Sequence, residues 1–369
     1  MNLAHLTSAH PRYDTRIFHK MCVSLAHHDH EVNLIVADGN GDQVMSGINI
    51  LDVGSSRNRL DRIRNVPGRV LKKAKQLDAD LYHLHDPELI PIGLELKRLG
   101  KRVIFDSHED VPQQILSKPY LNPLLRWALS KVFCVYQNWA CKQLDGIVTA
   151  TPFIRDKFLA FNPNTIDINN FPLLEELGSE LDWSKKESVV CYVGGISRIR
   201  GAVELIQAMG DLKTRTHLIL VGNSDEALTS HLRKMPGWHD TESVGHLSRS
   251  GVREVMARSV AGVVNFLPAP NHIDAQPNKM FEYMSAGIPV IASDFPLWRE
   301  IISGNDCGLL VDPLNPSSIA EAIDYLVTYP YDAERMGRNG RVAVLRRYNW
   351  PNEEKKLLDF YKQVVLNSL

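Results

Sequence analysis

The sequence predicts an α/β protein built from two doubly wound domains that face each other across a cleft. Short apolar runs alternate with longer stretches of helical periodicity, and this alternating series occurs twice along the chain. Strands that alternate with helices imply right-handed crossovers and a parallel sheet covered on both faces. The length of 369 residues is also too great for one typical core.

The strands are expected where apolar runs are short and bounded by turn residues. In the first series they fall at residues 2–7, 31–37, 48–53, 80–85, 102–108, 146–151 and 165–170. In the second series they fall at residues 188–195, 216–223, 262–268, 289–294 and 308–312. A polar, turn-rich stretch separates the two series. We therefore predict a first domain over 1–175, a linker over 176–187 and a second domain over 188–345.

Bulk composition is that of an ordinary globular protein, with 44% hydrophobic and 23% charged residues. Lys and Arg number 42 against 43 for Asp and Glu, so net charge identifies no partner. The five cysteines form no C-x-x-C pair, which favours a reducing compartment over a disulfide framework or a zinc site. The N-terminus has no signal-peptide pattern, and no run of about 18 apolar residues occurs. We expect a cytoplasmic protein.

The first strand of the second series ends in a turn suited to phosphate. Gly194 and Gly195 allow a tight turn, and the following helix would offer free N–H groups to an anion. Arg198 and Arg200 lie in the same turn, and a guanidinium is a planar, permanently charged fork that matches phosphate. Glycines and arginines are also common in strand-to-helix turns that bind nothing. No G-x-G-x-x-G is present, which argues against a nicotinamide cofactor.

The stretch QPNKMFEYMSAGIPVIAS, residues 276–293, predicts a short helix followed by a buried strand. The free N–H groups at the helix start, Asn278–Lys279, are expected near Arg200. Glu282 can grip the vicinal hydroxyls of a ribose, and Asp274 in the preceding loop can reach a sugar. Alternatively, Glu282 complements the helix dipole, worth about 0.3–1 kcal/mol, and Asp274 makes a local turn.

These motifs carry a resemblance to a known family. Seven residues separate Asp274 from Glu282, and Glu282 is followed by Y-M-x-A-G-x-P-V-I-A-S. This pattern resembles the signature of retaining GT-B glycosyltransferases of family 4, of the bacterial surface-polysaccharide type. The turn VGGISRIRG at 193–201 aligns with their V-G-R-L-x-x-x-K-G turn. The end of the chain, 346–369, is similar to their closing helix, which starts at a Trp and packs back toward the first domain. The resemblance implies two Rossmann-like domains.

The resemblance assigns roles to individual residues. Glu282 matches the acid that holds the donor ribose, Asp274 the acid near the donor sugar, and Arg200 the Lys that neutralises the diphosphate. Two departures occur: Asp274 stands where relatives carry Glu, and Gly195 where they carry Arg, so that Arg198 is a candidate to supply the missing charge. The expected donor-binding set is Gly194, Gly195, Arg198, Arg200, Gly222, Asn278, Lys279, Met280 and Glu282.

Three segments of the first domain bring polar residues to strand ends: SAHPRYDTRIFHKM (8–21), HLHDPELIP (83–91) and FDSHEDVP (105–112). In the resemblance the first is a loop that meets donor phosphate and acceptor, and His108 matches a histidine that contacts the transferring sugar. A lone His at a strand end is otherwise most often an ordinary hydrogen-bonding residue. The expected catalytic residues are His108, Arg200 and Asp274. The expected acceptor-side residues are His10, Arg12, Asp14, Arg16, Asp86 and Glu109.

The acids and histidines of these strand ends also raise the hypothesis of a metal site. No H-E-x-x-H or comparably tight spacing occurs, so we expect no metal.

Two segments suggest contact with a surface. Residues 57–75 hold eight basic residues and one acid, with apolar residues at roughly helical spacing. They form either a solvated helix face or a contact with an anionic membrane. No aromatic platform or helix-turn-helix pattern accompanies them, so nucleic acid is not expected. The acid-free stretch 119–144 is either a core helix or part of an acceptor-lipid groove.

The expected function is retaining transfer of a hexosyl or N-acetylhexosaminyl group from a nucleotide-diphosphate sugar, with UDP the favoured nucleotide. The acceptor would be a glycan or a polyprenyl-linked glycan at the inner face of the cytoplasmic membrane, and no cofactor is needed. Two alternatives remain open: a UDP-sugar epimerase of the same fold, and a non-catalytic subunit that binds a nucleotide sugar. The intact acid-x7-acid spacing argues against the non-catalytic subunit.

Overall fold

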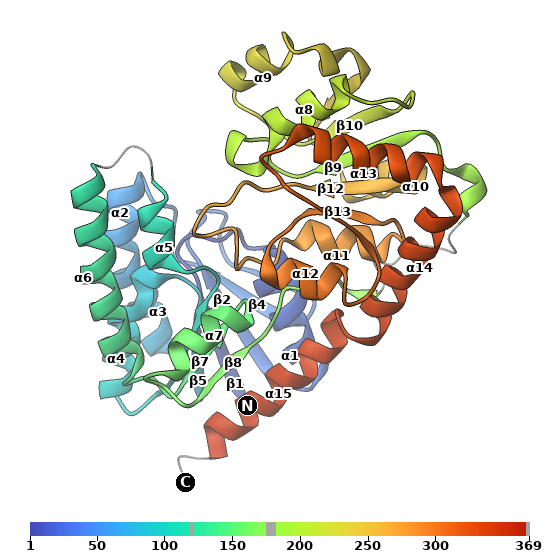
Figure 1. Cartoon of the computed structure of the whole chain (residues 1–369). Helices are drawn as coiled ribbons and strands as arrows, with labels where there is room; N and C mark the ends of the chain where they lie inside the picture. The colour runs from blue at the N-terminus through green and yellow to red at the C-terminus, as the bar shows by residue number, and fades with distance from the viewer. Residues whose placement is uncertain (119–121, 175–181, 367–369) are drawn as a thin grey trace. The chain divides into compact units, whose positions relative to one another are not determined.

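The computed structural model describes residues 1–118, 122–174 and 182–366. The chain divides into two compact units (Figure 1). The first unit is Met1–Asn170 with Trp350–Leu369, and the second unit is Phe171–Asn349. Of the predicted linker 176–187, residues 176–181 lie outside the described part of the chain, and the rest contains the 3₁₀ turn η4 (Trp183–Lys185).

Among its described residues, the first unit has a sheet of eight strands, in which only the edge strand β3 is antiparallel to its neighbour. The strands are β1 (Asn2–Leu6), β2 (Glu31–Val36), β3 (Gln43–Met45), β4 (Ile48–Asp52), β5 (Leu81–Leu84), β6 (Arg102–Ser107), β7 (Gly146–Thr149) and β8 (Thr165–Asp167). Their order is β3-β4-β2-β1-β5-β6-β7-β8. The direction of winding reverses between β1 and β5, and ligands of such sheets bind outside the carboxyl ends of the strands at this switch point.

The sheet of the second unit has six parallel strands. They are β9 (Val189–Val193), β10 (His217–Val221), β11 (Thr241–Gly245), β12 (Ala261–Val264), β13 (Val290–Ser293) and β14 (Gly308–Val311). The order β11-β10-β9-β12-β13-β14 places the switch point between β9 and β12. Both units are therefore doubly wound, and this confirms the predicted fold class.

Helices connect the strands in both units (Figure 1). Those of the first unit are η1 (Thr15–Cys22), α1 (Val23–His27), α2 (Arg59–Arg64), α3 (Val66–Leu77), η2 (Pro87–Leu89), α4 (Ile90–Arg98), α5 (Val111–Leu116), α6 (Pro123–Cys141), α7 (Pro152–Leu159) and α15 (Trp350–Leu366). Those of the second unit, besides η4, are η5 (Arg198–Arg200), α8 (Ala202–Gly210), α9 (Glu226–Leu232), η6 (Pro236–Asp240), α10 (Arg249–Arg258), α11 (Asn278–Ser285), α12 (Pro296–Ile302), α13 (Pro316–Thr328) and α14 (Pro330–Arg346).

Each strand expected from the sequence is present, and two further strands, β3 and β11, were not predicted. Both are edge strands with partly exposed side chains, so neither shows the apolar run of a strand buried on both faces. A two-residue turn joins β3 to β4. Ser46 and Gly47 both adopt positive φ there, 52° and 76°, as such a hairpin turn requires.

The last helix, α15, completes the core of the first unit. Trp350 begins it and donates its indole N–H to Ser24 Oγ at 2.8 Å. Farther along, Phe360 packs against β7 so closely that a Cβ at Gly146 would lie 2.7 Å from its ring. This helix begins at Trp350, within the predicted segment 346–369, and belongs to the first unit.

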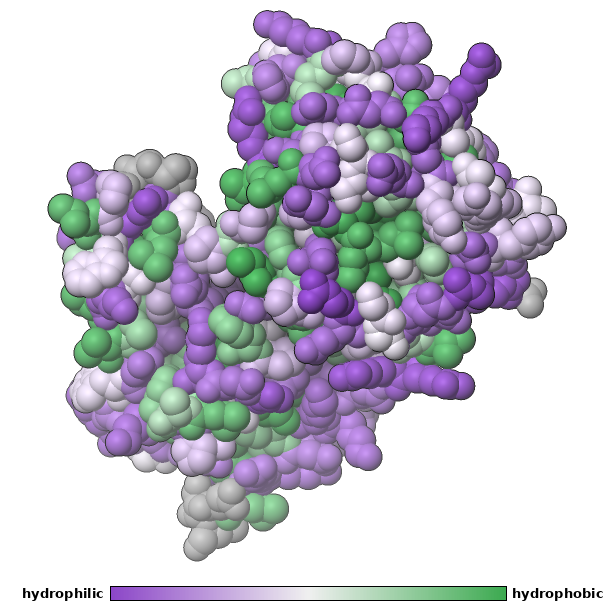
Figure 2. Space-filling model, in the orientation of Figure 1, coloured by the Kyte–Doolittle hydropathy of each residue, from purple (hydrophilic) through white to green (hydrophobic). Residues whose placement is uncertain are grey.

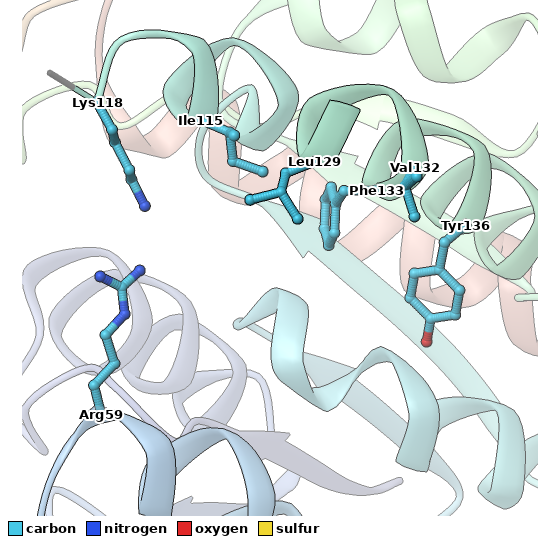
Figure 3. Close-up of a pocket in the computed structure, with 7 residues that line it drawn as sticks. All are labelled: Arg59, Ile115, Lys118, Leu129, Val132, Phe133 and Tyr136. Carbon is cyan, nitrogen blue, oxygen red and sulfur yellow. The ribbon is translucent and has the colours of Figure 1, made fainter. Parts of the chain in front are cut away.

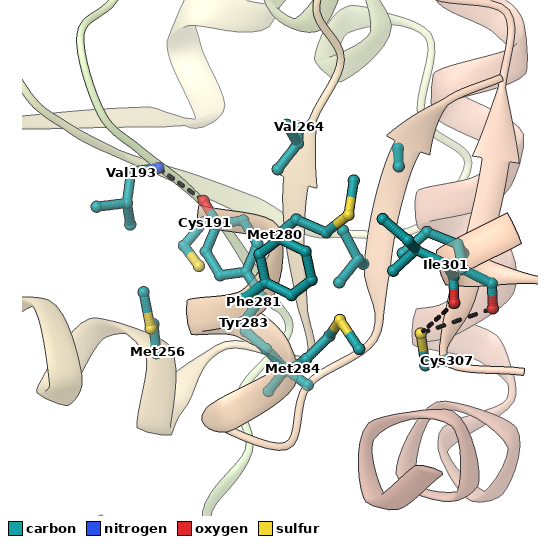
Figure 4. Packing of buried hydrophobic residues seen from close by; sticks show 14 of the residues in the cluster. Cys191, Val193, Met256, Val264, Met280, Phe281, Tyr283, Met284, Ile301 and Cys307 are labelled. Carbon is teal, nitrogen blue, oxygen red and sulfur yellow. Dashed lines mark hydrogen bonds between the residues drawn. The ribbon is translucent and has the colours of Figure 1, made fainter. Parts of the chain in front are cut away.

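Helix α11 is anchored to the switch point of the second unit (Figure 4). The Tyr283 hydroxyl accepts a hydrogen bond from the backbone N–H of Val193 at 2.8 Å. A Cβ at Gly262 would lie 2.3 Å from the Tyr283 ring, so β12 needs glycine there for α11 to pack. Met280, Phe281 and Tyr283 are fully buried. This packing fixes the start of α11 beside the ends of β9 and β12.

Candidate active site

In the second unit, two glycines bring the ends of β9 and β10 into close approach. Gly194 and Gly222 have φ of 139° and 144°, a region that side chains rarely adopt. A Cβ at Gly222 would lie 1.8 Å from the carbonyl O of Gly194. No other residue fits at position 222, because the backbone after β10 lies directly against the backbone after β9.

Arg200 covers the turn that follows. Its Nη1 donates to the carbonyl O of Gly195 at 3.3 Å, and a Cβ at Gly195 would lie 2.8 Å from the same nitrogen. The guanidinium also lies 5.5 Å from the ring centroid of Phe266, within cation–π distance. Arg200 thus fills the space above Gly195, whereas Arg198 points into solvent. Arg200, and not Arg198, therefore lies against Gly195.

A buried amide fixes the turn that carries Arg200. Asn265 Nδ2 donates to the carbonyl O of Gly201 at 2.7 Å, and Asn265 is fully buried after β12. Gly201 ends η5 in the left-handed conformation, with φ of 74°. A Cβ there would lie 2.1 Å from the carbonyl O of Asn265. The loops after β9 and β12 are therefore locked together.

Helix α11 supplies the other charged groups of this site. The Lys279 ammonium donates to Glu282 Oε2 at 2.5 Å, and each side chain is about one third exposed. Lys279 lies beside the β9 turn, since a Cβ at Gly194 would be 4.0 Å from its Cγ. Asn278 is exposed at the helix start, whereas the Met280 side chain is fully buried and faces the core.

Asp274 is half-buried in the loop between β12 and α11. The site therefore places Arg200 beside Gly195 and Lys279 beside Gly194, with the partly exposed carboxylate of Glu282 next to Lys279. Cations and helix N–H groups around a glycine turn suit a diphosphate.

In the first unit, imidazoles form a chain at the β1–β5 switch point. His5 Nδ1 lies 2.8 Å from His85 Nε2, and His85 Nδ1 lies 3.2 Å from His108 Nε2. At the buried end, the Tyr361 hydroxyl bonds to His83 Nδ1 and lies 3.2 Å from His5 Nε2. His5 and His83 are fully buried and His85 nearly so, whereas the His108 side chain is 17% exposed. The chain thus leads from the α15 core to the surface.

Asp106 and Arg16 lie beneath this chain as a buried ion pair. Arg16 donates to both carboxylate oxygens of Asp106, at 2.9 and 3.0 Å, and to the carbonyl O of Ile168 at 2.6 Å. Asp106 Oδ2 lies 3.2 Å from His108 Nε2. Burial acts to raise the pKa of Asp106, but Arg16 and His108 outweigh it and hold that pKa well below its usual value.

Burial also keeps the inner imidazoles neutral. It lowers the pKa of His85 to about 4, and it lowers the pKa of His5 and His83 well below 6.5. His85 therefore links His5 to His108 as a neutral ring, with one nitrogen donating and the other accepting.

His10 lies over His108 and between two carboxylates. The two rings have centroids 4.7 Å apart, and the His10 nitrogens lie 3.4 Å from Asp86 Oδ1 and 3.6 Å from Asp14 Oδ2. Burial acts to lower the pKa of His10, but the hydrogen bond to Asp14 and the charge of Asp86 outweigh it and raise the pKa. Asp86 Oδ2 accepts from the Ser8 N–H at 2.7 Å, so the loop after β1 is held in place.

The structure brings together some of the predicted acceptor-side residues and not others. His10, Asp14, Arg16 and Asp86 lie around the His85–His108 pair. Arg12 instead donates to Asp38 at 2.6 and 2.7 Å, and to Gly41 and Gln43, so its guanidinium holds the loop after β2. Glu109 is exposed and bonds to Gln114.

Sequence reasoning missed three members of the cluster: His5, Asp106 and Tyr361. His5 is a polar residue inside an otherwise apolar strand, and that exception is the signal that could have found it. No sequence signal links Tyr361 to His83, because 278 residues separate them.

Two overlapping groups have ligand atoms close enough for a metal ion: His5, His83 and His85, and His85, Asp106 and His108, each set within 4.8 Å. Arg16 already pairs with both oxygens of Asp106, and the imidazoles already bond to one another and to Tyr361. The expectation of no metal stays a prediction.

Two family models match this chain, one in each unit. Residues 15–168 match Glycosyltransferase Family 4, and residues 175–343 match Glycosyl transferases group 1. An uncharacterized glycosyltransferase of Methanocaldococcus jannaschii is 26% identical over 311 residues, covering 77% of this chain and 75% of that protein.

Solved structures share the fold. Sucrose-phosphate synthase from Thermosynechococcus elongatus superimposes with a TM-score of 0.80 at 18% identity, covering 98% of both chains. Alr3699/HepE from Anabaena, solved with UDP and glucose, has a TM-score of 0.75 at 13% identity, covering 98% of this chain and all of that one. The class is therefore that of the GT-B-fold enzymes. This chain belongs to the family 4 glycosyltransferases.

Proposed function

We propose that this protein is a retaining glycosyltransferase that moves a hexosyl or N-acetylhexosaminyl group from a UDP-sugar to a glycan or polyprenyl-linked glycan in bacterial polysaccharide synthesis. The observation that carries the proposal is Arg200 folded over Gly195, with Lys279 beside Gly194. Two cations around a glycine turn suit the diphosphate of a nucleotide sugar.

The main chemical demand is the negative charge that grows on the departing diphosphate. The bond between the anomeric carbon and the diphosphate oxygen breaks, and UDP leaves with the electron pair. Arg200, Lys279 and the free N–H groups at the start of α11 would stabilise this charge. These groups serve in place of a metal ion, and removing one such donor typically costs about 10²–10³ in rate.

Glu282 would hold the ribose. Its carboxylate is one third exposed and lies on the first turns of α11, where it can accept hydrogen bonds from two vicinal hydroxyls. Lys279 holds the carboxylate in position through their ion pair. Asp274, in the loop before the helix, would contact the donor sugar.

The first unit would recognise the sugar and the acceptor through His10, Asp86 and His108. Neutral His85 and anionic Asp106 orient the His108 ring, so its position does not depend on solvent. In the retaining reaction the acceptor hydroxyl attacks from the face that the diphosphate leaves. Its oxygen forms the new bond to the anomeric carbon, and its proton passes to a diphosphate oxygen.

The choice of UDP is supported by the similar structure from Anabaena, which was solved with UDP and glucose. The choice of a lipid-linked glycan is supported by the basic residues of α2 and by the acid-free sequence of α6.

A donor-hydrolysis panel tests the proposal. The purified protein is incubated with UDP-, GDP- and ADP-sugars in EDTA, and NMR follows release of the nucleoside diphosphate. Slow release from a UDP-sugar is expected. Release from a GDP- or ADP-sugar would overturn the choice of UDP, and release that requires added metal would overturn metal independence. A new sugar-nucleotide isomer would identify an epimerase. Binding with no release, even after addition of membrane extract, would identify a non-catalytic subunit.

A further inference from the structure

Helix α6 does not bury its large apolar side chains as an ordinary surface helix does. Amphipathic helices turn their apolar side chains inward and their polar ones outward. The buried residues of α6 are instead Ser130, Gln137, Ala140 and Cys141. Ser130 Oγ donates to the carbonyl O of Pro112, at 2.9 Å, at the start of α5. The buried side of α6 therefore combines two polar residues with Ala140 and Cys141, and it carries no large apolar side chain.

The outer side of α6 is apolar. We call the following seven residues the α6 outer face: Leu124, Leu125, Trp127, Leu129, Val132, Val135 and Trp139, which are 43–79% exposed. Leu125, Leu129, Val132, Val135 and Trp139 succeed one another at spacings of three and four, so they form a continuous stripe. Figure 2 shows hydrophobic side chains at the surface of the part of the first unit that contains α6 in Figure 1. Single exposed apolar residues are ordinary, but a contiguous group marks an interaction site.

A groove of about 510 Å³ runs along the edge of this face. Leu129, Val132, Phe133 and Tyr136 of α6 line it together with Ile115 of α5. Arg59 of α2 and Lys118 point toward one another at one end (Figure 3). The groove is thus apolar along its length and cationic at one end.

The charge of this surface favours an anionic partner. Residues 111–144 contain no Asp or Glu and four basic residues, Lys118, Arg126, Lys131 and Lys142. Together with Trp127 and Trp139, they combine the three features of a helix that lies in a membrane interface: an apolar face, amphipathic aromatic rings and basic side chains.

We propose that the α6 outer face and its groove dock this protein on an anionic lipid leaflet. The apolar residues enter the boundary between headgroups and acyl chains, with the helix axis in the plane of the membrane. Arg59 and Lys118 hold the phosphate of a lipid whose chain lies along the groove. Among the described residues no helix is both long enough and apolar enough to cross a bilayer, so α6 would lie on the membrane.

The proposal takes up one of the alternatives left open by the sequence. Of the stretch 119–144, residues 119–121 lie outside the described part, and α6 buries Ala140 and Cys141 in the core but exposes the seven residues of its outer face. In 57–75, Val66 and Val70 are buried, whereas Leu60 and Ile63 of α2 are 65% and 45% exposed. Only α2 therefore extends the surface.

Vesicle sedimentation with the full chain tests the proposal. We expect binding to vesicles of phosphatidylcholine mixed with phosphatidylglycerol, and much weaker binding to phosphatidylcholine alone. The triple variant Leu124→Ser/Val132→Ser/Val135→Ser should lower the partition coefficient by about tenfold or more, because three apolar contacts are lost. Lys131→Ala should lower it by about fivefold on anionic vesicles only.

The matched control is Leu314→Ser/Val342→Ser in the second unit, whose two residues are 60% and 43% exposed. It should bind like the wild type, and thermal unfolding checks that every variant is folded. Absence of binding to anionic vesicles, or equal binding by the triple variant, overturns the proposal. A dimer that the triple variant converts to a monomer, without vesicle binding, would assign the face to a second copy of this chain. Vesicle binding needs no donor and donor hydrolysis needs no vesicle, so this proposal and the proposed function can each fail alone.

Discussion

The guanidinium of Arg200 lies over Gly195, with Nη1 3.3 Å from the carbonyl O of that glycine. A side chain at position 195 would collide with it. The glycine at position 195 therefore leaves room for the guanidinium of Arg200, which brings a positive charge to this turn.

Arg200→Ala is expected to lower kcat by about 10²–10³, because the departing diphosphate loses a positioned cation. Donor turnover measured at saturating donor checks this. Arg198→Ala is the matched control, since Arg198 is exposed on the same turn. The decrease in kcat of this variant should be much smaller. Equal effects of the two substitutions would show that net charge, and not the position over Gly195, matters.

Glu282→Ala is expected to raise the donor KM with a smaller change in kcat, because a ribose contact is made equally in the ground state and the transition state. Steady-state kinetics with varied donor measures it. The donor KM of Glu282→Gln should rise less, because Gln keeps the side-chain length. An unchanged KM in Glu282→Ala would remove this residue from the ribose site.

Gly222→Ala is expected to abolish donor binding and to destabilise the second unit, since the added Cβ would lie 1.8 Å from Gly194 O. Gly245→Ala is the control from the same sheet. Gly245 also has positive φ, 68°, but nothing lies within 4 Å of its added Cβ. Gly245→Ala should lower the free energy of unfolding by about 1 kcal/mol only, from backbone strain. Urea unfolding and donor titration compare the two, and similar losses in both variants would contradict the close approach.

Acidification is expected to destabilise the first unit between about pH 6.5 and pH 4. His5, His83 and His85 have folded-state pKa values below 6.5, so the unfolded chain binds their protons first. The contribution of these three rings to the free energy of unfolding is full above pH 6.5. It decreases as the pH falls toward the folded-state pKa, which is about 4 for His85. Each ring contributes about 1.4 kcal/mol per pH unit within its window.

His10 acts in the opposite direction, because its raised pKa adds stability below pH 6.5 that is lost as pH rises through the folded pKa. Urea midpoints across this pH range measure the sum. His85→Gln should flatten the profile, and a profile with no slope would mean that the inner imidazoles are protonated in the folded protein.

The sequence predicts the parallel strands and the turns well, because runs such as VVCYV in β9 are buried on both faces and bounded by glycine. Edge strands β3 and β11 escape prediction because half-exposed residues give no apolar run. In the site, Glu282 and Arg200 lie in local motifs that resemble the family signature, whereas their spacing alone also fits purely structural roles. Arg12 lies after β1 as expected, but its guanidinium donates to Asp38 after β2. A local motif cannot reveal such a competing partner.

The histidine chain is the least predictable part. His85 and His108 are 23 residues apart, and only strand order brings them within 3.2 Å. Tyr361 comes from the far end of the chain. Neutral inner rings require full burial, which depends on α15.

Because α15 holds Trp350, Leu357, Phe360 and Tyr361 in the core of the first unit, the order of synthesis and the order of folding differ. The second unit, Phe171–Asn349, is complete before α15 is translated. The core of the first unit therefore cannot be completed until the whole second unit has been synthesised and α15 follows it. A nascent chain stalled before Trp350 would therefore carry a finished second unit behind an N-terminal half with an open core, and that half is where chaperones should bind.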